Sequence, residues 1–189
     1  MTKIGVILGS TRPGRKGEVI AKWVVEQAST RADATFELVD LADFPLPHLD
    51  EELPPSRGVY ANDHTKAWSA RISQFDGFVF VTPEYNHSTS GVLKNALDYL
   101  YLEWNNKTVG FVSYGVAGGI RAVEHLRVIV AELQMADVRN QVAISLISDF
   151  TNFTTFNPTE MHMASLTAML NQLVGWADAL ESVRAPSKA

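Results

Sequence analysis

The residues best suited to chemistry form one short run near the amino terminus. The run 9–17 reads G-S-T-R-P-G-R-K-G, follows the apolar segment 4–8 and precedes an amphipathic helical pattern. A strand that enters a helix through such a turn leaves free backbone N–H groups at the helix start, where the helix dipole favours negative charge. The run therefore predicts an anion site, and its hydroxyls and cations favour a phosphate. The alternative is a basic surface turn that caps a helix.

The spacing of the glycines separates three kinds of phosphate loop. The dinucleotide fingerprint G-x-G-x-x-G is absent from this run. Gly9 and Gly14 have the spacing of a nucleoside-triphosphate loop, but Arg15 replaces its lysine, and Lys16 stands where a Mg²⁺-binding hydroxyl is required. A cation at that position repels the metal. A terminal phosphate monoester, such as that of flavin mononucleotide (FMN), needs hydroxyls, amides and a cation without a metal, and it fits best.

The composition of the chain limits its partners and its chemistry. The 189 residues are 46% hydrophobic, which fits one domain with a substantial core. A net charge of −5 and a pI near 5.5 argue against a nucleic-acid partner. The absence of cysteine excludes disulfides, thiolate catalysis, iron–sulfur clusters and thiolate zinc sites. The histidines lack metal-ligand spacing, so no metal site is expected.

Targeting signals and long apolar runs are missing from the sequence. The amino terminus leads directly into a predicted strand and shows no signal-peptide pattern. No apolar run approaches the roughly 20 residues of a membrane span. We therefore expect a cytoplasmic protein with no membrane span.

Five apolar segments are predicted to be strands, and helical patterns separate them. The predicted strands are 3–8, 35–40, 77–82, 108–113 and one within 138–147. The segment 77–82 is continuously apolar, as in a buried parallel strand, whereas 35–40 alternates and is expected nearer an edge. The proline-rich stretch 41–59 predicts a long loop. This alternation implies an α/β fold with a three-layer, doubly wound, five-stranded parallel sheet. We expect a single domain over 1–185 and a frayed tail over 186–189.

Three loops are predicted to meet at one edge of this sheet. In a doubly wound sheet, ligands bind beyond the carboxyl ends of the strands. The loops after the first, third and fourth strands are 9–17, 83–90 and 114–119. The second and third of these are rich in Pro, Gly, Asn, Ser and Tyr, which suits backbone contacts to a flat heterocycle. The three loops together therefore predict a site for a ligand with a phosphate and a ring.

Two further patterns carry structural expectations. Asn157, Pro158 and Glu160 predict a helix with Asn as its N-cap and Pro at its first position. The aromatic and aliphatic run 99–104 is compatible with core packing or with an interface between two copies of the chain. The interface is favoured, because Tyr and Trp are enriched in such contacts. The phenylalanines of 150–156 are expected to cover the pocket or a neighbouring subunit.

Four segments carry a resemblance to a known family. They are G-S-T-R-P-G-R at 9–15, P-E-Y-N at 83–86, G-V-L-K-N-A-L-D at 91–98 and Y-G-V-A-G-G at 114–119. With these segments the chain resembles the NADPH-dependent FMN reductase family over nearly its whole length. That family comprises flavodoxin-like flavoproteins, among them quinone, azo-dye and chromate reductases. The resemblance implies a strand order of 2-1-3-4-5, non-covalently bound FMN, NAD(P)H as co-substrate, and homodimers or dimer-of-dimers tetramers.

The resemblance also assigns the residues that bind FMN. It implies that the phosphate is held by Ser10, Arg12 and Arg15, with the help of amides near Gly17. It implies that the isoalloxazine ring is edged on one side by Pro83, Glu84, Tyr85 and Asn86, and lies on the other side against Ser113, Gly115 and Gly118. The chain departs from related loops at Gly17, where other members carry Ser or Thr, so a second hydroxyl contact is not expected there.

Individual side chains of the second loop have narrower expectations. Glu84 is expected to position backbone, through an ion pair with a partner subunit, rather than to act as a base. Tyr85 either lies near the flavin or packs at the base of the loop. His87 is expected to be a solvated loop residue.

No catalytic side chain is predicted, because the hydride chemistry belongs to the flavin. Backbone amides of the second and third loops are expected to stabilise the charge of the reduced ring. The expected reaction is ping-pong: NAD(P)H reduces FMN and leaves, and a small-molecule acceptor such as a quinone or azo compound then enters the same pocket. One alternative is a flavodoxin-like electron carrier without its own NAD(P)H reductase activity. A second alternative is a small nucleotide-binding or kinase-like protein.

Overall fold

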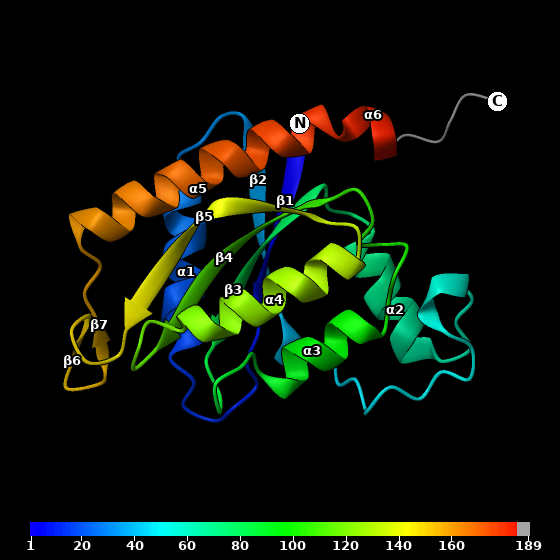
Figure 1. Cartoon of the computed structure of the whole chain (residues 1–189), viewed down its shortest axis with the longest axis horizontal. Coiled ribbons are helices and arrows are strands. Elements are labelled where there is room, and N and C mark those ends of the chain that lie inside the picture. The colour runs from blue at the N-terminus through cyan, green and yellow to red at the C-terminus, as the bar shows by residue number, and fades with distance from the viewer. Residues whose placement is uncertain (185–189) are drawn as a thin grey trace.

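The computed structural model describes residues 1–184, and a five-stranded sheet runs through its centre (Figure 1). The strands are β1 (Thr2–Leu8), β2 (Ala34–Asp40), β3 (Gly77–Pro83), β4 (Thr108–Gly115) and β5 (Ala136–Ser145). Their order is β2-β1-β3-β4-β5, and every neighbouring pair is parallel. The five predicted strands and their order are thus confirmed, except that β5 begins at Ala136, before the predicted segment 138–147. The expected frayed tail 186–189 and the end of the expected domain at 185 lie outside the described residues.

Helices cover both faces of the sheet. They are α1 (Gly17–Ala28), α2 (Asp63–Ile72), α3 (Gly91–Asp98), α4 (Ile120–Glu132), α5 (Glu160–Ala179) and the short α6 (Glu181–Arg184). Helices α1 and α5 pack with one face of the sheet, and α2, α3 and α4 pack with the other. A small antiparallel hairpin of β6 (Phe150–Thr151) and β7 (Thr155–Phe156) precedes α5. Across residues 1–184, every helix is too short or too polar to span a bilayer.

The central strands are apolar because both of their faces are covered. Every residue of β3 and β4 is buried, whereas most of β2 at the edge is partly exposed. Alternate side chains of β3 point to opposite faces, so Val79 and Val81 join the core beneath α1 and α5. Phe78 and Phe80 join the core beneath α2, α3 and α4. Two separate apolar cores therefore hold the sheet rigid beneath its loops.

The start of α5 differs from the sequence prediction. The N-cap is Thr159, whose hydroxyl accepts a hydrogen bond from the His162 amide, while His162 Nδ1 accepts one from the Thr159 amide at 3.0 Å. The predicted cap, Asn157, is committed to the β6–β7 hairpin instead. Its amide donates to Asp149 O at 2.8 Å, and its side chain donates to Thr151 Oγ1 at 2.9 Å. Because these hydrogen bonds hold Asn157 at the hairpin, it does not cap α5.

The aromatic run after α3 lies mainly in the core. Tyr99, Leu100 and Trp104 are at most 1% exposed, and Trp104 packs against Phe78 with 5.0 Å between ring centroids. The interface expected for these three residues is therefore wrong. The chain leaves the helix after 98 and turns, which lets side chains too closely spaced for one helical face all reach the core. Leu102 is the exception, since it is 53% exposed.

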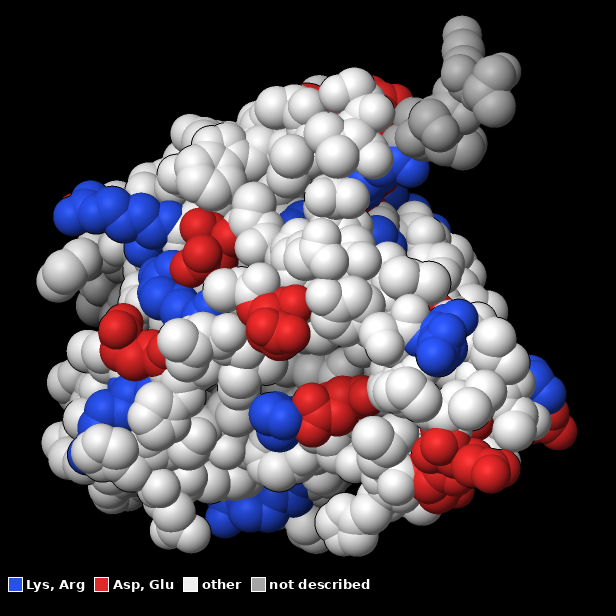
Figure 2. Space-filling model, turned by 45° about the vertical axis from the view of Figure 1, so that its right-hand side comes forward, with Lys and Arg blue, Asp and Glu red and all other residues white. Residues whose placement is uncertain are grey.

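Charges of both signs are interspersed on the face of the molecule drawn in Figure 2. Lys and Arg do not form a continuous area on that face, and acidic side chains lie between them. This distribution agrees with the net charge of −5.

Candidate functional site

Three loops meet at the carboxyl edge of the sheet, as predicted. We call 9–17 loop 1, 83–90 loop 2 and 114–119 loop 3. Ser10 Oγ and Tyr85 Oη lie 2.9 Å apart and join loop 1 to loop 2. The Glu84 amide donates to Tyr114 O at 3.0 Å and joins loop 2 to loop 3. The three loops thus form one connected surface.

Loop 1 delivers the chain to α1 without a side-chain cap. Pro13 and Gly14 form a turn closed by a hydrogen bond from the Arg15 amide to Arg12 O at 3.1 Å. Gly14 has a φ of +69°, a conformation that glycine adopts without strain. No side chain caps the N-terminus of α1 at Lys16. The first-turn amides and the positive end of the dipole therefore remain available to an anion.

Close packing beneath loop 1 explains why Gly17 begins the helix. A β carbon at Gly17 would lie 2.6 Å from Tyr114 Oη and 2.7 Å from Leu8 Cδ1. Tyr114 Oη is buried and has no hydrogen-bond partner among residues 1–184. Burial raises the pKa of this phenol, so it stays a neutral donor. Its position under loop 1 makes Tyr114 part of the packing that supports the start of α1.

The two arginines of loop 1 have different environments. Arg15 forms a bidentate ion pair with Asp40 at the end of β2, in which Nη1 of Arg15 lies 2.7 Å from Oδ1 of Asp40. Arg15 Nη1 also donates to Ser10 O at 2.5 Å, and the bond to Asp40 raises the pKa of this guanidinium. Arg12 is exposed, and none of the ion pairs within residues 1–184 involves it. Arg15 thus fixes the shape of loop 1, and Arg12 is the cation that an anion can reach.

Loop 2 contains a tight turn with an unusual backbone. The Tyr85 amide donates to Ser88 O at 2.9 Å, and the Ser88 amide donates back to Tyr85 O at 3.1 Å. Asn86 and His87 between them have φ values of 49° and 71°, the signs of a type I′ turn. The Tyr85 hydroxyl is held by Ser10, so this side chain is fixed between loops 1 and 2.

Glu84 ties loop 2 to the start of α4. Its side chain is only 7% exposed and forms an ion pair with Arg121. Glu84 Oε2 also accepts a hydrogen bond from the Arg121 amide at 3.2 Å. The expected ion pair exists, but its partner lies in the same chain and not in a partner subunit. His87, exposed as expected, accepts a hydrogen bond at Nδ1 from Arg121 Nη1 at 3.1 Å.

Buried contacts fix the backbone of loop 3. Ser113 is buried, and its hydroxyl donates to Gly118 O at 2.7 Å, so it holds the loop in shape. Gly118 and Gly119 both have φ of +72°, and a β carbon at Gly119 would lie 2.7 Å from Tyr114 N. A β carbon at Gly115 would lie 3.3 Å from Glu84 Cβ. Gly118 and Gly119 therefore allow the backbone conformation of loop 3, and Gly115 lets this loop lie close to loop 2.

The structure brings all the predicted site residues to this edge, at different depths. Ser10, Gly17, Pro83, Ser113, Gly115 and Gly118 are buried, Arg15, Glu84 and Tyr85 are partly buried, and Arg12 and Asn86 are exposed. Sequence reasoning missed the residues that hold these in place, Asp40 and Arg121. Neither belongs to a motif, and each is distant in sequence from its partner.

Sequence reasoning also missed a cavity of about 610 Å³ that adjoins loop 1 at Thr11. Leu41, Ala42 and the segment 44–48 form one wall, and residues of α3, among them Val92 and Asn95, form the other. The prolines of this region predicted a loop and gave no sign that it shapes a cavity.

The arrangement fits a ligand with a phosphate and a flat ring. The uncapped α1 terminus and the exposed Arg12 offer donors to an anion. Loops 2 and 3 offer closely packed backbone beside it. Among residues 1–184 there is no group of His, Cys, Asp or Glu suited to a metal ion. FMN is a ligand of this kind.

Comparison with known proteins agrees with this geometry. The sequence profile of the family described as NADPH-dependent FMN reductase matches residues 2–149. The NAD(P)H-dependent FMN reductase of Schizosaccharomyces pombe is 44% identical over 149 residues, which are 78% of this chain and 74% of that protein. The 2-hydroxy-1,4-benzoquinone reductase of a Burkholderia species is 32% identical, over 70% of this chain and 72% of that protein.

A solved structure shows the same fold. FerB, a flavoenzyme NAD(P)H:(acceptor) oxidoreductase of Paracoccus denitrificans, matches with a TM-score of 0.74 at 21% identity. The match covers 95% of this chain and 98% of that chain. Together with the strand order, this likeness confirms the expected flavodoxin-like fold.

Proposed function

The chain belongs to the NADPH-dependent FMN reductase family, and from this we propose that it is an NAD(P)H-dependent flavoenzyme acting on small-molecule acceptors of the quinone or azo class. FMN binds without a covalent bond at loops 1, 2 and 3. The observation that carries the proposal is the uncapped start of α1 together with the exposed Arg12, which forms no ion pair with any residue of 1–184. A bound FMN phosphate would explain why a chain with a negative net charge places hydrogen-bond donors and a cation at the start of α1.

Loop 1 holds the phosphate in this proposal. Arg12 supplies the reachable positive charge, and the first-turn amides from Gly17 onward supply N–H donors. Ser10 and Arg15 act mainly by shaping the loop, since Ser10 is bonded to Tyr85 and Arg15 to Asp40. This division of roles refines the expectation that all three side chains grip the phosphate.

Loops 2 and 3 hold the ring through their backbone. FMN supplies the hydride chemistry when bound. The segment Pro83 to Asn86 and the residues Ser113, Gly115 and Gly118 set the position of the ring. Glu84 is not a general base, because its carboxylate is already held by the Arg121 guanidinium and amide. No side chain of the chain is therefore assigned an acid or base role.

Assembly and location complete the proposal. We infer a homodimer, or a dimer-of-dimers tetramer, in the cytoplasm. Ile120 and Val128 support an interface, because they lie two turns apart on α4 and are 48% and 71% exposed. Light scattering at micromolar concentration tests the assembly, and cell fractionation tests the location. A monomer, or a protein found outside the cytoplasm, contradicts the corresponding statement.

Anaerobic mixing with NADPH tests the proposed activity. The protein is loaded with FMN, desalted and mixed with NADPH in a stopped-flow instrument. We expect a yellow protein whose flavin absorbance bleaches rapidly and returns when a quinone is added. A yellow protein that NADPH does not bleach is an electron carrier and overturns the activity. A colourless protein after desalting overturns the cofactor as well.

A further inference from the structure

Three nitrogen-bearing side chains meet at the surface beside loop 2. They are His87 of loop 2 and Arg121 and His125 of α4, and all three are exposed. The centroids of the two imidazole rings lie 6.3 Å apart. Arg121 Nη1 lies 3.1 Å from His87 Nδ1, and His125 Nδ1 lies 2.9 Å from Ser88 Oγ. We call His87, Arg121 and His125 the loop 2 cluster. Neither histidine has a role in the proposed binding of FMN.

The hydrogen bonds around the loop 2 cluster leave N–H donors without a protein partner. His87 accepts from Arg121 at Nδ1, so its neutral ring carries the proton on Nε2. When the Ser88 hydroxyl donates to His125 Nδ1, His125 also carries its proton on Nε2. A guanidinium has more N–H donors than the contacts of Arg121 with His87 and Glu84 use. Donors from three side chains therefore remain for a ligand.

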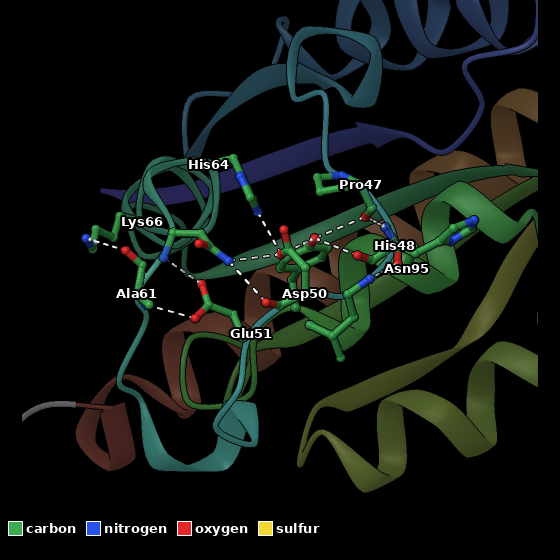
Figure 3. A network of polar contacts seen from close by, with 11 residues as sticks. Pro47, His48, Asp50, Glu51, Ala61, His64, Lys66 and Asn95 are labelled. Atoms are coloured by element: carbon green, nitrogen blue, oxygen red, sulfur yellow. Dashed lines mark hydrogen bonds and ion pairs between the residues drawn. The ribbon is translucent and has the colours of Figure 1, made fainter.

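The partners of the two histidines differ from that of another histidine in the chain. His64 Nε2 lies 3.0 Å from Asp50 Oδ1, in a network of hydrogen bonds that ends at a carboxylate (Figure 3). His87 and His125 lie beside a guanidinium and beside each other. An imidazole next to a carboxylate has its counter-charge within the chain, whereas imidazoles next to a cation favour an added anion.

Two acidic side chains belong to the same elements and do not block the loop 2 cluster. Glu84 balances the charge of Arg121, but its side chain is only 7% exposed, whereas that of Arg121 is 46% exposed. The carboxylate thus lies deeper than the guanidinium. Glu124 of α4 lies 3.9 Å from Arg127 instead. An anion that arrives from solvent therefore meets N–H donors rather than carboxylate oxygens.

A phosphate monoester suits these donors. Such a group has three terminal acceptor oxygens and roughly two negative charges at pH 7, and arginine is well suited to bind it. FMN has a single phosphate, for which loop 1 is proposed. The other phosphate-bearing molecule of the proposed reaction is NAD(P)H. Only NADPH carries a monoester, which is attached to the 2′ oxygen of its adenosine ribose.

We infer that the loop 2 cluster binds the 2′-phosphate of NADPH and thereby makes the chain select NADPH over NADH. The inference rests on the proposed function and adds the residues that distinguish the two reductants. The pyrophosphate is common to both dinucleotides, so a cluster that bound it would not separate them. The loop 2 cluster belongs to loop 2 and to α4, which follows loop 3, so it borders the loops that are proposed to hold the flavin ring.

Binding of two adenosine phosphates tests the loop 2 cluster without a redox reaction. Calorimetry measures the affinities of adenosine 2′,5′-bisphosphate and of 5′-AMP for the oxidised, FMN-loaded protein in phosphate-free buffer. The two probes differ only in the 2′-phosphate. We expect the unmodified protein to bind the bisphosphate about tenfold or more tightly than 5′-AMP, because charge-assisted hydrogen bonds hold the added group. Equal affinities for the two probes overturn the inference.

Single substitutions locate the source of this difference. His125→Ala should lower the affinity for the bisphosphate by about fivefold or more and leave that for 5′-AMP unchanged, because one donor to the 2′-phosphate is lost. His125→Lys supplies a donor and a cation again and should restore the affinity. His48→Ala is the matched control, since His48 is also exposed but lines the cavity at loop 1, and it should change neither affinity.

Two outcomes of these substitutions contradict the assignment. One is a His125→Ala variant that binds the bisphosphate as tightly as the unmodified protein. The other is a loss of affinity that His125→Lys does not restore, since a merely structural role of the imidazole would not be rescued by a lysine. Circular dichroism and light scattering accompany each titration. A variant that loses the bisphosphate only together with its fold or its oligomeric state also overturns the assignment.

Reduction of the flavin separates a failure of this inference from a failure of the proposed function. Stopped-flow mixing compares NADPH and NADH as reductants of the FMN-loaded protein. We expect kcat/KM for NADPH to exceed that for NADH by about tenfold or more, and His125→Ala to remove most of this preference by raising KM for NADPH. A flavin that neither dinucleotide bleaches overturns the proposed function. Bleaching by both with equal efficiency leaves the proposed function standing and overturns the role of the loop 2 cluster alone.

Discussion

Single residues divide into those that face a ligand and those that hold others in place. Arg12 and Arg15 look equivalent in the sequence, since both belong to one short basic run. The structure separates them, because Asp40 takes the Arg15 guanidinium and leaves Arg12 exposed. The charge available to a phosphate therefore depends on a carboxylate 25 positions away from its partner.

The Arg15–Asp40 pair should contribute measurably to stability. Both side chains are less than one-fifth exposed, at 13% and 18%, so Asp40→Asn leaves a partly buried guanidinium without its counter-charge. We expect the free energy of unfolding to fall by about 1–3 kcal/mol in urea denaturation. Asp43→Asn is the control, because Asp43 is exposed in the next turn, and it should change stability by less than about 0.5 kcal/mol. Equal effects of the two substitutions contradict the assigned role.

Lys107 should make stability depend on pH. Burial lowers its pKa from 10.5 to about 8, and Nζ donates to Ile72 O at 2.9 Å. Between these pH values the unfolded chain binds more protons at this site than the folded chain, so stability rises with pH. We expect the stability of the unmodified protein relative to Lys107→Met to increase by about 2 kcal/mol between pH 8 and pH 10. If the difference in unfolding free energy between the two proteins stays constant from pH 8 to pH 10, burial does not lower the pKa of Lys107.

At the scale of elements, long-range contacts decide where the loops lie. The strands, their order and the meeting of three loops followed from apolar segments and glycine-rich turns. The N-cap of α5 and the burial of Tyr99 and Trp104 did not follow, because they depend on the β6–β7 hairpin and on a turn after α3. The sequence also did not predict the Glu84–Arg121 ion pair, because any of several arginines could have been the partner of Glu84. Local sequence preference thus predicted the strands and the meeting of the loops. Tertiary contacts determined where α5 begins and which residues hold the loops in place.

The Glu84–Arg121 pair should control how loops 2 and 3 hold a ring. Arg121→Ala leaves the nearly buried Glu84 carboxylate without its counter-charge. We expect this change to lower the affinities for FMN and for riboflavin by a similar factor of about ten, because the two molecules have the same isoalloxazine ring. Arg57→Ala, at an exposed loop position, is the control and should change neither affinity. Loss of FMN binding with riboflavin unaffected shows that Arg121 acts on the phosphate instead.

At the scale of the whole molecule, two apolar cores support one chemically active edge. The chain carries a net charge of −5, yet loop 1 concentrates cations and free amides at the start of α1. Asp, Glu, Lys and Arg side chains are absent from the lining of the cavity that adjoins loop 1. The edge therefore combines a local anion site with an adjoining apolar cavity.

The central claim is that Arg12 and the start of α1 bind the phosphate of FMN. Quenching of flavin fluorescence measures the affinities of FMN and riboflavin for the unmodified protein and for Arg12→Ala, with circular dichroism as a check of folding. Arg12→Ala should lower the affinity for FMN by about 10- to 100-fold, as expected for loss of a charge-assisted hydrogen bond. The affinity for riboflavin should change by less than about twofold, because riboflavin has no phosphate. Unchanged FMN affinity, or an equal loss for both flavins, would contradict a phosphate site at loop 1.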